Sequence, residues 1–302
     1  MTDIKTNDVS QHGRISRILL LGASGQLGRG LSRLYGRRND VTLIEAHRNH
    51  REASQRLDIT DVEAICSAIA ELKPDVVINA AACANVDRCE VEPNETERAN
   101  VEGAAAVALA CERQRAWCVH FSTDYVFNGE DGPYRSTDPV APLNAYGRQK
   151  ARAEQEVLER CSNAIVLRVS QVYDGPAHPV GFVKRLLEAD EKSETLVVSR
   201  SLFCTPVHVA DILQRIDQLL GSGTRGLFHV AGPDHVSRFE ALLLAKKALG
   251  LSRVRLQPID KTPEQRAPRP ALAGLVDDPT GPDAAAPRSI EMHLSGQANG
   301  ID

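Results

Sequence analysis

The sequence predicts an α/β protein, with a Rossmann-type, doubly wound parallel sheet and a small C-terminal substrate-binding lobe. Two observations carry this prediction. From Ile15 to about residue 175, apolar runs suited to buried parallel strands alternate with amphipathic segments. The first run, Ile18–Leu21, leads into the glycine-rich turn Gly22–Gly28 and then into a helical pattern that starts near Arg29. A strand, a glycine turn and a helix in this order are typical of a dinucleotide-binding site.

Each glycine of the turn has a physical role in such a site. Gly22 permits a tight turn, Gly25 lets the backbone approach a pyrophosphate, and Gly28 allows the helix to pack closely on the strand. The helix N-terminus would then face the phosphates. The spacing is G-x-x-G-x-x-G, and glycine turns also join ordinary strands and helices, so the turn alone does not establish the site.

The remaining elements follow in the same alternating order. We expect strands at 41–44, 75–79, 117–121, 164–168, 195–198 and 226–230, and helices at 62–72, 99–115, 146–160, 181–188, 209–220 and 239–249. In parallel sheets, ligands bind outside the carboxyl ends of the strands. The glycine turn, Asn79 and Thr123 all follow strand ends, so we expect them to meet at one edge.

Composition shifts divide the chain into four expected parts. These are a disordered leader (1–14), a dinucleotide-binding domain (15–175, completed by 205–232), a mainly substrate-binding lobe (176–262) and a largely disordered tail rich in proline and alanine (263–302).

Bulk properties exclude several classes of protein. The 302 residues are 42% hydrophobic, which is enough for a substantial core, and the net charge of −4 gives no sign of a nucleic-acid partner. No apolar run is long enough to span a membrane, and seven cysteines without a C-x-x-C pair suggest reduced thiols in the cytoplasm. We expect no metal site, and either a monomer or a homodimer.

The chemistry is concentrated near the middle of the chain. A hydroxyl (Ser122 or Thr123), the phenol of Tyr146 and the ammonium of Lys150 lie within one short stretch. Tyr146 and Lys150 are four residues apart and so share a helix face. A nearby ammonium favours the phenolate, so we expect the pKa of Tyr146 to be lowered and the phenol to act as a proton donor or acceptor.

With these stretches the chain resembles the extended short-chain dehydrogenase/reductases, and within them the dTDP-4-dehydrorhamnose reductase-like family. The matching stretches are Gly22–Gly28, Asn79–Ala82, Val86-Asp87, Ser122–Phe127, Pro142–Lys150 and Arg168–Tyr173, and the resemblance covers about residues 15–260. It implies reduction of a 4-keto-6-deoxy nucleotide sugar by NADPH or NADH.

The resemblance also implies roles for single residues. Thr123 would bond the substrate carbonyl oxygen, Tyr146 would deliver a proton, and Lys150 would hold the nicotinamide ribose, with Asn100 supporting it through a water. The implied cofactor contacts are Gly22, Ser24, Gly25, Gln26, Leu27, Gly28, Asp58, Ile59, Asn79, Ala80, Ala81, Tyr146 and Lys150. The implied substrate contacts are Cys83, Val86, Thr123, Asp124 and Gln171.

The choice of cofactor rests on the end of the second strand. Glu45 is expected at that end, where an acid would bind both ribose hydroxyls of NAD. Arg48 and Arg29 are candidates to clamp the 2′-phosphate of NADP instead. We favour NADPH, with NADH possible.

The chain departs from the family around the expected sugar pocket. Cys83 and Ala84 replace larger polar residues, Gln171 replaces a tryptophan, and Phe203–Pro206 replaces a Gly-x-Pro-Thr segment. These changes keep two alternatives open: a reductase of another activated sugar, and a dinucleotide-binding regulatory subunit that resembles the β subunit of methionine adenosyltransferase. An epimerase or dehydratase is disfavoured because Asp124 is followed by Tyr125.

Overall fold

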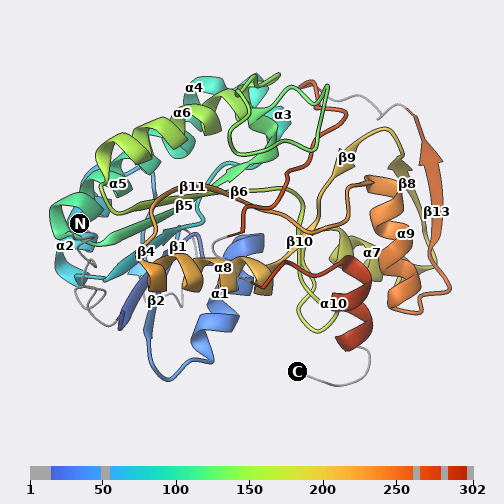
Figure 1. Ribbon diagram of the computed structural model, residues 1–302, viewed down its shortest axis with the longest axis horizontal. Helices are drawn as coiled ribbons and strands as arrows, with labels where there is room; N and C mark the ends of the chain where they lie inside the picture. The colour runs from blue at the N-terminus through green and yellow to red at the C-terminus, as the bar shows by residue number, and fades with distance from the viewer. Residues whose placement is uncertain (1–14, 49–54, 261–265, 280–284, 298–302) are drawn as a thin grey trace, which may run out of the picture.

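A seven-stranded parallel sheet forms the centre of the molecule in the computed structural model, which describes residues 15–48, 55–260, 266–279 and 285–297 (Figure 1). The predicted leader, residues 1–14, lies outside the described residues. The strands are β1 (Arg17–Leu21), β2 (Thr42–His47), β3 (Gln55–Arg56), β4 (Val76–Asn79), β5 (Trp117–Thr123), β6 (Ala164–Val169) and β11 (Gly226–Val230). Their spatial order is β11-β6-β5-β4-β1-β2-β3.

The strand order reverses at β1, which lies between β2 and β4. The chain therefore leaves β1 and β4 in opposite directions and opens a crevice at their carboxyl ends, where ligands bind in sheets of this kind. The glycine turn follows β1, and Asn79 ends β4. The predicted doubly wound fold is confirmed.

Helices cover both faces of the sheet (Figure 1). On one face α1 (Gln26–Gly36) packs with α8 (Val209–Ser222), and on the other α2 (Val62–Leu72), α5 (Gly103–Gln114) and α6 (Ala145–Arg160) lie in a row. Each layer has its own core of buried side chains, with Leu31 and Ile216 in the first and Ile69, Val107 and Val157 in the second. Strands buried on both sides explain why these segments of the sequence are continuously apolar.

The smaller lobe lies beyond the carboxyl ends of the strands (Figure 1). It contains α7 (Gly181–Lys192), β8 (Thr195–Ser199), α9 (Arg238–Ala248), β13 (Arg255–Ile259) and α10 (Ile290–Gln297), with β13 parallel to β8. Two short pairs, β7 (Val172–Tyr173) with β10 (Val207–His208) and β9 (Phe203–Cys204) with β12 (Val236–Ser237), join the lobe to the sheet domain. Non-contiguous segments therefore build each part.

Two boundaries near the site differ from those expected, and one short helix was not expected. Strand β2 runs to His47, so Glu45 lies inside the strand instead of at its end. The helix expected from residue 99 begins earlier, as α4 (Pro93–Glu97), and passes through a π-helical turn, η2 (Arg98–Glu102), before α5. A further helix, α3 (Val86–Val91), was not predicted because it is too short to show a clear period.

The C-terminal segment corrects a larger expectation. Residues 263–302 were expected to be largely disordered, yet Ile290 and Leu294 of α10 are fully buried against α9 and Tyr173. Asp277 pairs with the buried Arg215 at 2.8 Å. A composition rich in proline and alanine misled the prediction because a few well-spaced apolar side chains suffice to dock such a segment. No helix among the described residues is long and apolar enough to cross a membrane.

Candidate active site

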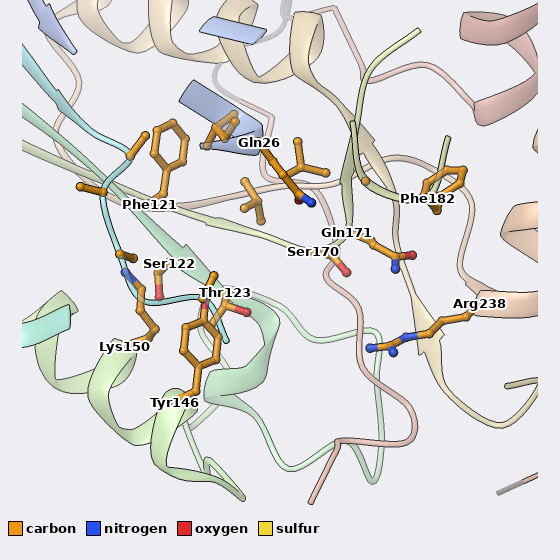
Figure 2. A pocket seen from close by; sticks show the side chains of 18 of the residues that line it. Gln26, Phe121, Ser122, Thr123, Tyr146, Lys150, Ser170, Gln171, Phe182 and Arg238 are labelled. Carbon is orange, nitrogen blue, oxygen red and sulfur yellow. The ribbon is translucent and has the colours of Figure 1, made fainter. Parts of the chain in front are cut away.

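Three hollows meet along the carboxyl edge of the sheet. A central cavity of about 540 Å³ is lined by residues of β4, β5, α6 and α7 (Figure 2). A groove of about 420 Å³ continues from it and shares Ala80, Ala81 and Ala84 with it. A side pocket of about 150 Å³ shares Thr123 and Gln171 with the central cavity. The arrangement gives one long site with a branch.

The glycine turn forms the floor of the groove, with no room for side chains. Gly22 has a φ of +74°, and a Cβ there would lie 2.7 Å from the Cα of Ala81 across the crevice. A Cβ on Gly28 would lie 2.1 Å from the Gly22 carbonyl oxygen, so helix α1 must approach the turn at its glycine. Gly25 caps α1 without a side-chain hydrogen bond, and N–H groups at a helix N-terminus attract phosphate.

Strand β5 delivers the predicted hydroxyl to the cavity. Thr123 is its last residue, and the Thr123 hydroxyl donates to Asp124 Oδ1 at 3.1 Å and accepts from the Tyr125 amide. Ser170 donates to the other Asp124 oxygen at 2.6 Å. Burial raises the pKa of the Asp124 carboxyl in spite of these hydrogen bonds. Asp124 therefore orients the hydroxyl of Thr123.

The first turn of helix α6 packs closely against the loop that follows β5. Asn144 caps the helix by accepting from the Gly147 amide at 2.8 Å, and its own amide donates to the Pro268 carbonyl. A Cβ on Gly147 would lie 2.1 Å from the Tyr125 carbonyl oxygen. The Pro-Leu-Asn-x-Tyr-Gly stretch thus begins the helix and lets Tyr146 stand beside Thr123 (Figure 2).

The pKa of Tyr146 differs from the expectation. Burial, and next the nearby Asp124 carboxylate, raise the pKa of Tyr146 above its ordinary value, and a hydrogen bond with Thr123 opposes them only in part. The predicted lowering by Lys150 is absent because its Nζ faces His120 instead of the phenol. Tyr146 therefore keeps its proton at neutral pH.

Lys150 is buried and points toward β5. Its Nζ lies 3.0 Å from His120 Nε2, and His120 Nδ1 lies 3.2 Å from the Asn79 side-chain amide nitrogen. Burial lowers the pKa of Lys150 to about 8, although the Glu154 carboxylate opposes the shift. Burial, and next the charge of Lys150, hold the pKa of His120 well below its usual range. His120 is buried and hydrogen-bonded.

The cavity is lined by two cations that sequence reasoning missed. Arg238, the first residue of α9, lines the cavity and donates to the Tyr125 hydroxyl at 2.8 Å, and Arg185 of α7 also lines the cavity. Ser170 lines the cavity and was not predicted, and Ser122, the alternative to Thr123 as the candidate hydroxyl, lines it as well. The Ser122 hydroxyl is buried and has no hydrogen-bond partner among the described residues. No local motif marks either arginine, because the lobe brings both to the site.

The candidate cofactor residues divide between two hollows. Arg48, Asp58 and Ile59 line the groove together with Gly22, Ser24 and Gly25. Glu45 and Arg29 instead line a separate hollow of about 740 Å³ beside α1, which also reaches Ser24. Glu45 is bound by the Ser32 hydroxyl and lies 3.4 Å from His47 Nε2. Of Arg48 and Arg29, only Arg48 lines the same groove as Asp58.

The remaining candidates spread along the site. Three of the predicted cofactor contacts line the central cavity, namely Gln26, Leu27 and Asn79. Val86, Asp124 and Gln171 line the side pocket, and the Gln171 side chain accepts from the Cys204 thiol at 3.3 Å. Cys83 lines the groove instead, away from the other substrate candidates.

Asn100 is buried in the π-helical turn and holds the chain at Cys83. Its side chain accepts from the Cys83 amide at 2.7 Å and donates to the Cys83 carbonyl and to the Gln149 side chain. A role in supporting Lys150 through a water stays a prediction.

These features fit a dinucleotide. The glycine cradle excludes side chains, a helix N-terminus faces the groove, and the buried Ser122 hydroxyl, unpaired among the described residues, lines the cavity. A pyrophosphate matches the first two features and a polar ring substituent matches the third. The groove and cavity together resemble an extended site with a polar reaction chamber at one end.

Comparisons with known proteins agree with this geometry. A dTDP-4-dehydrorhamnose reductase of Shigella flexneri is 30% identical over 262 residues, which are 84% of this chain and 86% of that protein. The methionine adenosyltransferase 2 subunit beta of Pongo abelii is 29% identical over 276 residues, 86% of this chain and 80% of that protein.

Solved structures give the same picture. The crystal structure of dTDP-4-dehydrorhamnose reductase from Bacillus anthracis in complex with NADP is similar with a TM-score of 0.84 at 26% identity, covering 95% of this chain and 99% of that chain. The family described as the RmlD substrate binding domain matches residues 16–285. This chain belongs to the RmlD substrate-binding domain family.

Proposed function

We propose that the protein is an NADPH-dependent reductase of a 4-keto-6-deoxy nucleotide sugar. The observation that carries the proposal is the position of Thr123, Tyr146 and Lys150, which line one cavity at the end of a dinucleotide-type groove. The names of the relatives, dTDP-4-dehydrorhamnose reductases, support the same reaction.

The side chains suit the reduction of a ketone. A bound nicotinamide would supply the hydride to the carbonyl carbon. Negative charge then builds on the carbonyl oxygen, where the Thr123 hydroxyl would donate its hydrogen in place of the hydrogen bond to Asp124 and Tyr146 would deliver its proton. The raised pKa of Tyr146 supports this direction of reaction, because the phenol carries its proton before turnover at neutral pH.

The far wall of the cavity suits a nucleotide sugar. Arg238 lies across the cavity from Tyr146, as Figure 2 shows, and Arg185 lines the same cavity. Guanidinium groups bind phosphate oxygens bidentately and stay charged at every relevant pH. We assign the diphosphate of the substrate to this wall and its keto sugar to the space beside Thr123, Asp124 and Gln171.

NADPH is the preferred donor in this proposal. Arg48 lines the groove on the Asp58 side and is exposed, which suits a contact with a 2′-phosphate. Glu45, the acid that would favour NADH, is hydrogen-bonded by Ser32 and lines the neighbouring hollow. NADH remains a second substrate of the same groove.

A second candidate is a dinucleotide-binding regulatory subunit. It is favoured by the 29% identity to methionine adenosyltransferase 2 subunit beta over most of the chain, and by Gln171 and Cys83, which depart from the reductase pattern. The intact Thr123, Tyr146 and Lys150 set favours the reductase. All seven cysteines are free thiols, so we keep the cytoplasm as the proposed location, with a monomer or homodimer as the proposed state.

The test is oxidation of NADPH and of NADH, followed at the nicotinamide absorbance with dTDP-4-keto-6-deoxy sugars as substrates. The wild type is expected to turn over, faster with NADPH. Tyr146→Phe removes only the phenolic hydroxyl, so it should lose at least about a hundredfold in kcat while its Kd for NADPH changes little.

The outcomes separate the two candidates. Turnover by Tyr146→Phe equal to that of the wild type would refute the proposed role of the phenol. Tight NADPH binding without turnover on any keto nucleotide sugar would favour the regulatory subunit.

A further inference from the structure

Lys150 has an unusual nearest neighbour for a residue expected to act as a cation. Its Nζ lies 3.0 Å from a ring nitrogen of His120, a hydrogen-bond distance between two nitrogen bases. Both side chains are almost fully buried, with 3% of Lys150 and 1% of His120 exposed. One of the two groups must donate and the other accept.

The backbone decides which group donates. The Ala81 amide N–H donates to Asn79 Oδ1 at 3.1 Å. The other end of the Asn79 side chain, its NH₂ group, then faces His120 Nδ1 at 3.2 Å, and an NH₂ group can only donate. Flipping the amide would set two donors, the Ala81 N–H and the NH₂ group, against each other, so the polarity of this hydrogen bond is fixed.

The polarity of the hydrogen bond from Asn79 also determines the tautomer of His120. Because Nδ1 of His120 accepts from Asn79, the neutral ring carries its hydrogen on Nε2. That N–H points at Lys150 Nζ, where only an uncharged amine offers a lone pair to accept it. An ammonium group would instead set two donors against each other at 3.0 Å.

We propose that the chain from the Ala81 amide through Asn79 and His120 holds Lys150 as an uncharged amine, and that Lys150 takes up a proton from solvent when a dinucleotide binds. The amine becomes an ammonium, and no other bond is made or broken. The ammonium must leave His120, since the Nε2–H repels it, and it turns toward the cavity that Lys150 already lines. Asn79 and His120 are positioning residues in this proposal.

The charged groups around Lys150 leave His120 as its main partner. Glu154, one turn further along α6, is bound by both arms of Arg168 at 2.8 and 2.7 Å. Cys89 of α3 and Tyr146 of α6 are the other titratable neighbours, and burial raises the pKa of each, so both stay neutral near pH 7. Burial lowers the pKa of Lys150 to about 8, so the uncharged amine that the hydrogen-bond polarity requires predominates above pH 8.

This proposal rests on the proposed function, because the positive charge on Lys150 is useful only for the reduction. The charge appears when the dinucleotide binds. In the free protein above pH 8 the phenol of Tyr146 has no cation beside it and keeps its proton. Once a dinucleotide is bound, the ammonium of Lys150 favours the phenolate and so makes the proton of Tyr146 easier to transfer. Tyr146 is thereby activated only in a protein that holds its hydride donor.

The first measurement is the tautomer of His120 in the free protein at pH 8.5, from ring nitrogen shifts of ¹⁵N-histidine-labelled protein. His120→Gln identifies the resonances. The Nε2–H form is expected. An Nδ1–H form would overturn the proposal, and this measurement needs no substrate and no altered active site.

The second measurement is proton uptake when NADPH binds without sugar, from titration calorimetry at pH 9 in buffers of different ionisation enthalpy. The wild type should take up close to one proton per bound NADPH. Asn79→Asp keeps an acceptor for the Ala81 amide but turns the NH₂ donor into an acceptor, so the cluster holds its proton beforehand and the uptake should fall to near zero. Asn39→Asp, which adds the same charge at an exposed site, should behave as the wild type.

The result is independent of turnover. Uptake that is the same in the wild type and Asn79→Asp would refute the relay even if the protein reduces nucleotide sugars. A wild-type uptake near one proton, lost in Asn79→Asp, would support the relay even if no sugar is turned over.

Discussion

Gly147 sets the distance between the two hydroxyls of the site, although it lines no part of the cavity. The Tyr125 carbonyl would lie 2.1 Å from a Cβ on Gly147, so α6 and the loop after β5 are as close as their backbones allow. Tyr146 precedes this glycine and Thr123 lies two residues before Tyr125. The contact between backbones therefore fixes the contact between side chains.

Gly147→Ala should move α6 away from the loop and separate Tyr146 from Thr123. A misplacement of about 1 Å costs roughly a hundredfold in rate, and we expect a loss of this order in kcat. Gly36→Ala is the matched control, because that glycine ends helix α1 with nothing within 4 Å of a Cβ. It should retain full activity and gain about 0.5–1 kcal/mol of stability. Steady-state kinetics and urea unfolding of both variants measure these effects, and equal kcat values would contradict the argument.

Residues that follow strand ends were predictable from the sequence, because parallel strands carry their carboxyl ends to one edge. Thr123, Asn79 and the glycine turn meet as expected for that reason. Arg238 was not predictable, since its place depends on a hydrogen bond to Tyr125 across 113 residues of chain. The pKa of Tyr146 was predicted in the wrong direction, because shared helical spacing with Lys150 says nothing of which strand side chain the lysine meets.

Among the elements, long periodic helices and apolar strands were predicted closely, and short or atypical ones were not. Helix α2 begins and ends at the predicted residues, with Asp61 as its cap. Helix α10 and strand β13 were missed. A helix of eight residues in a proline-rich segment offers too few turns to show a period, and its order comes from the surface it covers.

The docking of α10 gives a prediction at this scale. Leu294 is fully buried while Met292, two residues earlier, is 60% exposed. Leu294→Ala should therefore lower the free energy of unfolding by about 2–5 kcal/mol, because it leaves a cavity. Met292→Ala should change it by less than about 0.5 kcal/mol. Equal urea midpoints for the two variants would show that α10 does not pack as described.

At the scale of the whole molecule, buried neutral histidines couple stability to pH. His229 is fully buried in β11, and its ring meets Phe127 edge to face. Burial, and next the charge of Arg168, lower the pKa of His229 to about 4 from the usual 6.5. Between pH 6.5 and 4, His229 is protonated in the unfolded chain but stays neutral in the folded chain. The free energy of unfolding therefore falls as the pH drops from 6.5 toward 4.

This linkage predicts a loss of about 3 kcal/mol between pH 6.5 and 4 from His229 alone. The raised pKa of Asp124 acts in the opposite sense, so the effect is isolated by comparison. His229→Gln should show a shallower dependence of unfolding free energy on pH, and His178→Gln, at an exposed position, should follow the wild type. Parallel slopes for all three proteins would contradict the assignment.

The late position of β11 in the chain has a consequence for synthesis. Strand β6 ends at Val169, but its partner β11 spans Gly226–Val230, with five residues of the two strands in register. While the ribosome makes the intervening lobe, β6 presents an open edge of continuously apolar sequence, the kind of edge that pairs with other chains. A gene cut after residue 175 would leave that edge open permanently, so the nucleotide-binding half is an unsuitable fragment to express alone.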